Sequence, residues 1–451
     1  MLYRKIEAEI EAYLRSQSDQ ILVIEGARQI GKSFIIREVG KRLFTNFVEI
    51  NFVEDDEGPG LFRNVHSSGD FYFVLSSVAG NNLGNYDNTL IFLDEIQHYP
   101  QFLTMLKFLR EDRRFRFIAS GSLLGITLRA TTSIPIGSIV RKPMYQLDFE
   151  EFLVANGFGL EAIAQLRTAF EQQQSLPEEQ HRYLLDLFRR YLFVGGMPAV
   201  VNEYLSTHNL VRVRDLQTAI GQLYEEDASK YEQEAGKQMT IRRIYNMVVS
   251  QMENKKKRIV AKDIRGRDGD RFERYEDDFE YLISSGIAIE VRAISNPRFP
   301  LSESLYKNLI KLYLNDVGML TAKLYGLNTQ PILEDQRSIN LGAVYESVVA
   351  QELRAHGNKL FYYDNRSKGE VDFIIDDFSA GTVVPIEVKS GRDYLIHSAL
   401  NNLLAAPDYN IQQAIVLSNE GQIRREGNIL YLPVYFAMFV GNRAAVREVY
   451  I

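Results

Sequence analysis

The sequence predicts an α/β protein of several domains, the first of which is a parallel β-sheet with helices on both faces. Three observations favour this fold class. A phosphate-binding motif occupies residues 26–33, an apolar strand ends in Asp94 and Glu95, and helix and strand patterns alternate up to about residue 150. With 451 residues, the chain is long enough for roughly two to four domains.

The composition is ordinary for a globular protein, with 45% hydrophobic and 25% charged residues. No apolar run is long enough to span a membrane and no signal-peptide pattern is present, so we expect a cytoplasmic protein with no membrane partner. The absence of cysteine excludes disulfides and zinc–thiolate sites. A net charge of −7 gives no overall attraction to nucleic acid, so binding of that kind would need a local basic patch.

The first elements of the chain surround the phosphate-binding motif. Residues 1–17 have the amphipathic pattern of a helix, the apolar run at 21–24 predicts a buried strand, and residues 34–36 suit the start of another helix. Between them, residues 26–33 match G-x-x-x-x-G-K-[ST] at every fixed position. Strand, loop and helix in this order are the context in which the motif binds phosphate, and a glycine-rich turn with a chance Lys-Ser pair is the alternative.

This motif predicts an ATP site. Glycine lets the backbone curl so that successive N–H groups face phosphate oxygens, and the following helix adds its positive end. We expect Lys32 to reach the β- and γ-phosphates as a catalytic residue, and the Ser33 hydroxyl to bind Mg²⁺. The residues expected to hold the nucleotide here are Gly26, Ala27, Arg28, Gln29, Ile30, Gly31, Lys32 and Ser33.

A second anchor of this site is expected at the end of a later strand. After an alternating strand at 47–52, residues 89–95 form an apolar strand that ends in Asp94 and Glu95. In a parallel sheet the carboxyl end of such a strand lies beside the phosphate loop. Asp94 would therefore complete the Mg²⁺ shell, and Glu95 would orient and deprotonate a water molecule.

A third strand is predicted at 116–122, where Ser120 or Ser122 could contact the γ-phosphate or the attacking water. An ordinary strand-end turn explains these serines equally well. Together the motifs resemble those of the AAA+ superfamily, and more closely those of a STAND-like bacterial and archaeal ATPase family with a C-terminal domain of unknown function. The resemblance rests on residues 26–33, 93–97, 120–122, 147–152, 195–198 and 311–318, with Pro100.

The AAA+ resemblance implies roles for further residues. The strand end at Ser120 matches the element called sensor 1, and a Gly-x-Pro element in a helical lid would bring Pro198 to the base of the nucleotide. Relatives often carry Gly-Arg before the Phe-Glu-Phe-like stretch, whereas serine follows Gly137 here. This departure puts an arginine that acts on a neighbouring subunit in doubt, and Arg129 and Arg141 are the substitutes that the sequence offers.

The middle of the chain predicts two helical regions. Residues 151–235 are rich in helix-forming patterns and would form the lid, in which the Gly195-Gly196 pair is otherwise an ordinary turn between helices. Residues 236–325 predict a winged helix, with helices around 241–248 and 279–283 and a strand at 287–291.

A basic patch lies in the predicted winged helix. Its members are Lys255, Lys256, Lys257, Arg258, Lys262, Arg265, Arg267, Arg271 and Arg274. Such a patch would neutralise phosphates of DNA or RNA. The alternatives are a solvated charged face, a contact between domains, or a surface that binds protein.

The C-terminal part carries a separate candidate site. A helix at 344–353, three strands and a helix near residue 398 carry Glu346, Asp372, Glu387 and Lys389 in that order. Glu387 and Lys389 are two residues apart on a strand and so face the same way, and Asp372 on the neighbouring strand can lie opposite them. The carboxylates, completed by Glu346, suit Mg²⁺, and Lys389 would polarise or position the attacking water.

This order of elements and residues resembles the PD-(D/E)xK nuclease superfamily, with Val371 where many members have proline. The resemblance implies a metal-dependent nuclease in which Asp372, Glu387 and Lys389 are catalytic. A nuclease-like fold that carries a surface ion pair and has no activity is the alternative.

The sequence thus predicts a P-loop AAA+ core at 1–150, a helical lid at 151–235, a winged helix at 236–325 and a restriction-endonuclease-like α/β domain at 326–451. ATP hydrolysis would switch or drive a C-terminal domain directed at DNA or RNA. The alternative is a nucleotide-gated binding or scaffold protein that scarcely hydrolyses ATP. A P-loop kinase is disfavoured because the two acids after the strand supply a base that activates water, and assembly into a homo-oligomer is left open.

Overall fold

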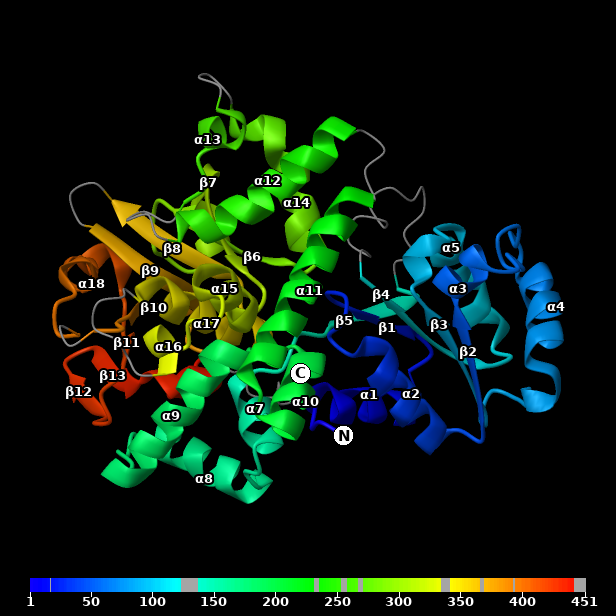
Figure 1. Ribbon diagram of the computed structural model, residues 1–451, viewed down its shortest axis with the longest axis horizontal. Helices are drawn as coiled ribbons and strands as arrows, with labels where there is room; N and C mark the ends of the chain where they lie inside the picture. The colour runs from blue at the N-terminus through cyan, green and yellow to red at the C-terminus, as the bar shows by residue number, and fades with distance from the viewer. Residues whose placement is uncertain are drawn as a thin grey trace. The chain divides into compact units, whose positions relative to one another are not determined.

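The computed structural model describes residues 1–16, 18–122, 137–230, 235–252, 258–266, 271–333, 341–365, 369–391 and 394–441. They form two compact units (Figure 1). The first is essentially Tyr3–Gln146, and the second begins at Leu147 and takes in most of the rest of the chain.

The first unit contains a five-stranded sheet of order β2-β3-β4-β1-β5, in which every pair of neighbouring strands is parallel. Its helices and strands are α1 (Lys5–Arg15), β1 (Ile21–Glu25), α2 (Lys32–Leu43), β2 (Asn46–Asn51), α3 (Phe52–Glu57), α4 (Ser68–Ala79), β3 (Thr89–Asp94), α5 (Gln101–Asp112), β4 (Arg116–Gly121) and β5 (Ile139–Pro143). The strands predicted at 21–24, 47–52, 89–95 and 116–122 are therefore present.

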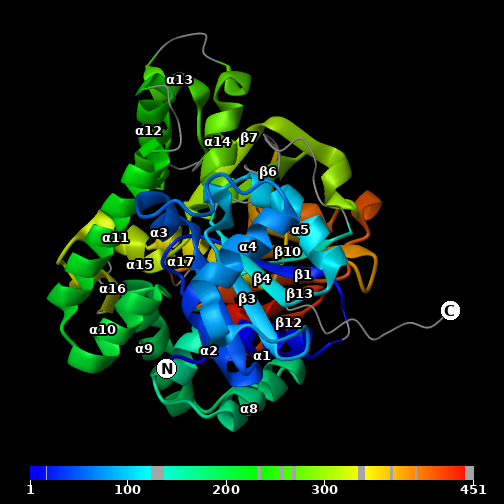
Figure 2. The ribbon, with the colours of Figure 1, turned by 90° about the vertical axis from the view of Figure 1, so that its right-hand side faces the viewer.

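Alternation of side chains along the strands explains how the helices cover this sheet. Val23 of β1 and Ile91 of β3 lie in one core with apolar residues of α4 and α5. On the opposite face α2 comes so close that a side chain at Gly40 would collide with the ring of Phe47 and approach Leu90. Helices thus cover both faces, as a parallel sheet requires (Figure 2).

The second unit begins with a series of helices. They are α7 (Phe149–Ala155), α8 (Leu160–Glu171), α9 (Glu178–Val194), α10 (Pro198–Thr207), α11 (Leu210–Lys230), α12 (Ala235–Gln251), α13 (Ala261–Arg265), α14 (Glu276–Ser284), α15 (Val317–Tyr325) and α16 (Gln330–Leu333). The region predicted as a lid is helical wherever it lies in regular elements, from α7 to α11. Among the described residues, no helix is both long and apolar enough to cross a membrane.

An eight-stranded mixed sheet of order β12-β13-β11-β10-β9-β8-β6-β7 completes the second unit. Its strands are β6 (Ala288–Ile294), β7 (Leu305–Leu314), β8 (Leu360–Asn365), β9 (Gly369–Asp377), β10 (Thr382–Val388), β11 (Ala414–Ser418), β12 (Arg424–Glu426) and β13 (Ile429–Pro433). Two helices accompany them, α17 (Gly342–Ala355) and α18 (Ser398–Leu404). From α17 to β11 the chain therefore follows the order helix, three antiparallel strands, helix, parallel strand.

The strands β6 and β7 differ from the prediction of a separate winged helix over 236–325. The helices expected there are present as α12 and α14, but the strand expected at 287–291 belongs to β6. This strand pairs with β7 on one side and with β8 on the other, so it continues the large sheet. Most residues of β6 are buried on both faces, and a strand of this kind needs cover on each side that a small wing does not supply.

A buried carboxylate fixes the turn between α9 and α10. Asp316 caps α15 by accepting a hydrogen bond from Met319 N (2.9 Å), and it also accepts one from Gly196 N (2.6 Å). Burial raises the pKa of Asp316 to about 6, against the opposing effect of these N–H groups. A Cβ at Gly196 would lie 2.0 Å from the carbonyl oxygen of Leu147, so only glycine fits this turn.

Candidate functional site

The phosphate loop between β1 and α2 has the backbone of an anion-binding nest. Gly26, Gln29 and Gly31 have φ angles of 153°, 61° and 92°. A Cβ at Gly26 would lie 2.2 Å from the carbonyl oxygen of Met144, so no side chain fits there. Residues of positive φ among residues of negative φ turn successive N–H groups toward one concave side, where an anion can bind.

Lys32 is the first residue of α2, and it is only 4% exposed. Its Nζ donates hydrogen bonds to the carbonyl oxygens of Gly26 (3.0 Å) and Ala27 (2.8 Å). Burial lowers the pKa of Lys32, while the nearby charges of Glu95 and Asp94 oppose that change. The backbone of its own loop therefore holds the ammonium group close to two acids.

Asp94, the last residue of β3, meets two of the predicted serines. The Ser120 hydroxyl donates to Asp94 Oδ1, and Ser33 is a second hydrogen-bond partner of this carboxylate. Burial raises the pKa of Asp94, and both hydroxyls oppose the rise. The parallel arrangement of β1, β3 and β4 therefore brings Ser33, Asp94 and Ser120 together at one edge of the sheet, next to the loop that carries Lys32.

Glu95 is held by a residue to which the sequence assigned no role. The Nε2 of Gln97 donates to Glu95 Oε2 (2.5 Å) and to the hydroxyl of Ser122 (3.2 Å). Gln97 is buried, and its Oε1 has no hydrogen-bond partner among the described residues. Glu95 itself has a φ of 55°, a conformation that costs a non-glycine residue about 1–2 kcal/mol. Gln97 could have been found from its position in the sequence, because it follows Glu95 by only two residues.

The remaining residues predicted for the nucleotide site have different surroundings. Ile30 is buried, and its carbonyl oxygen accepts a hydrogen bond from Arg4 (2.9 Å). Arg141 pairs with Glu25 on the neighbouring strand, with Nε 2.9 Å from the carboxylate. Arg129 lies outside the described residues. Pro198 begins α10 in the second unit, so its contact with the nucleotide base stays a prediction.

The second unit brings the four residues of the predicted metal site together. Glu346 comes from α17, Asp372 from β9 and Glu387 from β10. In the antiparallel ladder Ile386 pairs with Phe373, so the next pair along the strands is Glu387 and Asp372.

Two hydrogen bonds define the geometry of this pair. The Val388 N–H donates to Asp372 Oδ2 (2.9 Å), and Lys389 Nζ donates to Glu387 Oε1 (2.8 Å). Lys389 lies just beyond the end of β10, where its own N–H bonds to the carbonyl oxygen of Leu417 (2.8 Å).

Like charges crowd this pair. Burial raises the pKa of Asp372 well above its usual value, and the charges of Glu387 and Glu346 raise it further. Burial also raises the pKa of Glu387, against the attraction of Lys389. Glu387 is 6% exposed, and its Oε2 is buried without a hydrogen-bond partner among the described residues. Carboxylate oxygens are the ligands that divalent cations prefer, so the chemistry of this donor set suits one, although Glu346, Asp372 and Glu387 do not form a group with all its ligand atoms within 4.8 Å of one another.

Three further residues belong to this cluster, and the sequence assigned them no role. Tyr313 of β7 donates to Glu346 Oε2 (3.2 Å), and Lys311 Nζ lies 2.5 Å from Oε1 of Glu370 on β9. Burial alone would lower the pKa of Lys311, but Glu346, Glu370 and Asp372 outweigh it and raise that pKa. A lysine inside the apolar strand β7 was the available signal.

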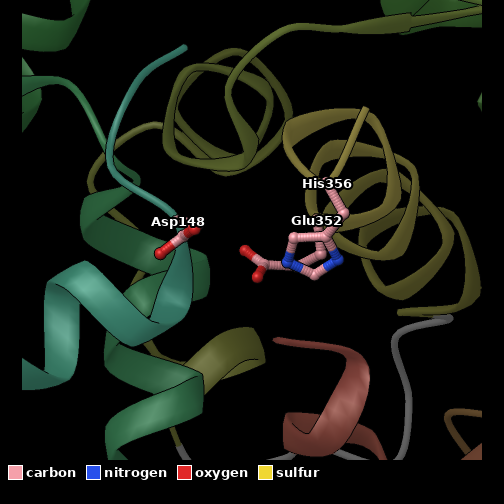
Figure 3. Close-up of side chains that lie close together, drawn as sticks. All are labelled: Asp148, Glu352 and His356. Atoms are coloured by element: carbon pink, nitrogen blue, oxygen red, sulfur yellow. The ribbon is translucent and has the colours of Figure 1, made fainter. Parts of the chain in front are cut away.

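A different group of buried titratable residues surrounds the start of α7 (Figure 3). The potential ligand atoms of Asp148, Glu352 and His356 lie within 4.8 Å of one another. Asp148 caps α7 by accepting from Glu151 N (2.9 Å), and Glu352 Oε1 accepts from Phe149 N (3.0 Å). Because the hydrogen bond between Phe149 and Glu352 joins α7 to α17, we assign the group a structural role.

The predicted basic patch is only partly described. Lys255, Lys256, Lys257 and Arg267 lie outside the described residues. Of the others, Arg258 pairs with Asp364 (3.2 Å), whereas Lys262 and Arg271 are exposed. These three basic residues line a cavity of about 770 Å³ together with Phe272 and Asn308.

The raised pKa values of Asp372 and Glu387 predict how stability changes with pH. The folded state retains protons that the unfolded state has released, so the unfolding free energy falls as pH rises through and above the usual carboxyl range. Asp372→Asn removes one of the crowded charges. Without metal, we expect the thermal midpoint of this variant relative to wild type to be higher at pH 8 than at pH 5. The exposed control Asp408→Asn should show no such difference between the two pH values. Equal destabilisation by Asp372→Asn at pH 5 and pH 8 would show that repulsion among these carboxylates does not lower the stability of the folded protein.

Three family models match successive parts of the chain. Residues 18–153 match "AAA domain", residues 185–330 match "Domain of unknown function (DUF8612)" and residues 341–436 match "Domain of unknown function (DUF4143)". No curated protein sequence matches the chain.

The chain is also similar to parts of solved structures of other proteins. The Walker-type ATPase of Pyrococcus abyssi is 14% identical, with a TM-score of 0.44, over 71% of this chain and 95% of that one. The ORC1 protein of Aeropyrum pernix, solved in complex with DNA, is 12% identical, with a TM-score of 0.30, over 74% and 94%. The RuvB Holliday junction branch migration motor of Thermotoga maritima is 14% identical, with a TM-score of 0.29, over 64% and 89%. The family match supports an AAA-type ATPase domain at residues 18–153, which contains the phosphate loop and the acids that follow β3.

Proposed function

We propose that this chain binds ATP with Mg²⁺ and hydrolyses it at the phosphate loop, and that hydrolysis switches or drives the C-terminal part. The observation that carries the proposal is the buried ammonium group of Lys32. It donates to two carbonyl oxygens of its own loop and lies beside a serine, two acids and a nest of backbone N–H groups. The charges and hydrogen-bond donors of these groups are complementary to the triphosphate of a nucleoside triphosphate with its Mg²⁺.

Each residue has a distinct task in this reaction. Lys32 and the loop N–H groups bind the β- and γ-phosphates, and Ser33 and Asp94 supply the oxygen ligands that suit Mg²⁺. Mg²⁺, when bound there, would neutralise charge on the phosphates. Glu95 orients a water molecule and accepts its proton as the oxygen attacks the γ-phosphorus, and the bond to the β-phosphate oxygen breaks, giving ADP and phosphate. Gln97, which also donates to the Ser122 hydroxyl, holds the carboxylate of Glu95 for this step.

Two substitutions test this site. Lys32→Ala should abolish ATP binding because the phosphates lose their main cation. Glu95→Gln should still bind ATP but hydrolyse it at least about 100-fold more slowly, because an amide cannot accept the proton. ATP binding by calorimetry and phosphate release check both results.

Exposed residues of α5 provide matched controls. Lys107→Ala and Glu111→Gln should bind and hydrolyse ATP as wild type does. Unchanged turnover in Glu95→Gln would remove the assigned role of Glu95. Binding without measurable turnover in wild type would favour the alternative of a nucleotide-gated binding or scaffold protein.

A second candidate function concerns the carboxylate cluster of the second unit. We propose that it is the centre of a metal-dependent nuclease of the PD-(D/E)xK kind. The support is the element order from α17 to β11, the position of Asp372 and Glu387 directly after the last ladder pair of β9 and β10, and the buried Oε2 of Glu387. Asp372, Glu387 and Glu346 would hold Mg²⁺, which would activate a water molecule when bound. Lys389 would position that water against a phosphodiester.

Cleavage assays on DNA and RNA test this second function. Wild type should cut at least one substrate in the presence of Mg²⁺ or Mn²⁺, and Asp372→Asn and Lys389→Ala should abolish cutting. ATP hydrolysis should survive both changes because its residues lie in the other unit. The exposed controls Asp408→Asn and Lys359→Ala should cut normally, whereas cutting that persists in Asp372→Asn would exclude this site as the source.

Binding of DNA or RNA would use the basic patch. The support is the cavity lined by Arg258, Lys262 and Arg271, of which Lys262 and Arg271 are exposed. Each phosphate contact adds about one unit to the slope of log affinity against log salt. Replacing Lys262, Arg271 and Arg274 by alanine should therefore flatten this slope by roughly two to three units. Lys41→Ala is the control and should leave the slope unchanged. An unchanged slope in the triple variant would show that the patch is a solvated charged face that does not bind nucleic acid.

A further inference from the structure

Two side chains of strand β7 contact the carboxylate cluster. This strand is not among the elements from α17 to β11 on which the nuclease proposal rests. Lys311 and Tyr313 are two residues apart on this strand, so they face the same way, and both are fully buried. Tyr313 donates to Glu346, and Lys311 forms an ion pair with Glu370. β7 is therefore part of the site.

Lys311 lies among several carboxylates. Glu370 and Asp372 alternate on β9 and so face the same side of the sheet. Glu346, Glu370 and Asp372 are the three acids whose charges act most strongly on Lys311. Its ammonium group also lies 4.6 Å from the centre of the Tyr362 ring. A fully buried lysine with such surroundings acts as a fixed cation.

The balance of charge limits what else the cluster can hold. Four carboxylates, those of Glu346, Glu370, Asp372 and Glu387, face the two ammonium groups of Lys311 and Lys389. When all are ionised, the excess is two negative charges, which one divalent cation neutralises. A second divalent cation would have to take the place of a lysine.

We propose that the cluster takes a single divalent cation and that Lys311 is the resident cation that replaces a second one. This inference rests on the proposed metal site of the second unit. Lys311 is a positioning residue: it holds Glu370, balances Glu346 and Asp372, and leaves the pair Asp372 and Glu387 to the metal.

Substitution by methionine tests this role because it keeps the length of Lys311 and removes its charge. In the absence of nucleotide, wild type should bind one Mn²⁺ at the cluster, which Asp372→Asn removes. Lys311→Met should lower the thermal midpoint without metal by roughly 5–10 °C. Mn²⁺ should restore most of that loss, and calorimetry should show a second bound Mn²⁺.

Lys323 provides a matched control. It too forms an ion pair, with Glu225 at 2.7 Å, and its ammonium lies 4.9 Å from the centre of the Tyr245 ring. Lys323→Met should lower the thermal midpoint equally with and without Mn²⁺ and leave the number of bound ions unchanged. The same behaviour in Lys311→Met would overturn the proposal, since Lys311 would then have a structural role alone.

A second variant covers the case in which Lys311→Met does not fold. Glu370→Gln leaves Lys311 with only the remaining carboxylates to balance, so the affinity for Mn²⁺ should fall by roughly tenfold or more. Unchanged affinity would contradict the proposal.

The outcomes separate this inference from the metal site on which it rests. If wild type and Lys311→Met each bind one Mn²⁺ at the cluster, this inference fails while the proposed metal site stands. If neither protein binds Mn²⁺ there, both proposals fail.

Discussion

Burial of charged side chains is the constraint on which both candidate sites depend. Removing an ion from water costs several kcal/mol, and only an opposite charge or a set of hydrogen bonds recovers that cost. Lys32 meets this condition with two carbonyl oxygens and the nearby Asp94 and Glu95. In the second unit, Lys311 and Lys389 form ion pairs with Glu370 and Glu387, so these buried charges also have opposite charges beside them. In the proposals above, an incoming phosphate or metal ion balances the charge that these internal contacts leave over.

The segment from Lys311 to Asp316 connects the carboxylate cluster of the second unit to the glycine turn before α10. Lys311 and Tyr313 reach the carboxylate cluster, and Asp316, just beyond the end of β7, holds the Gly196 N–H in the turn before Pro198. The motif quoted for the AAA+ resemblance at residues 311–318 therefore has a physical explanation. Its lysine balances buried acids, and its aspartate caps α15 and fixes the glycine turn.

The extent to which the sequence predicted these sites depended on the kind of signal. The strands of the first unit and the meeting of Ser33, Asp94 and Ser120 follow from local patterns, because parallel strands end at the same edge. The pairing of Asp372 with Glu387 follows from the alternation along adjacent strands. Lys311, Tyr313 and Glu370 were missed because their contacts join elements far apart in the sequence, and Gln97 was missed because its contact with Ser122 is also distant in the sequence. The separate winged helix was expected from helix patterns that cannot show which sheet β6 and β7 join.

A crystal structure grown with a non-hydrolysable ATP analogue and Mn²⁺ tests the central claim most directly, since anomalous scattering locates each metal ion. The account predicts the triphosphate between the loop N–H groups and Lys32, with Mn²⁺ at Ser33 and Asp94. It also predicts a single Mn²⁺ between Asp372 and Glu387, with Lys311 still beside Glu370. A triphosphate bound away from Lys32, or two ions in the cluster with Lys311 in place, would contradict it.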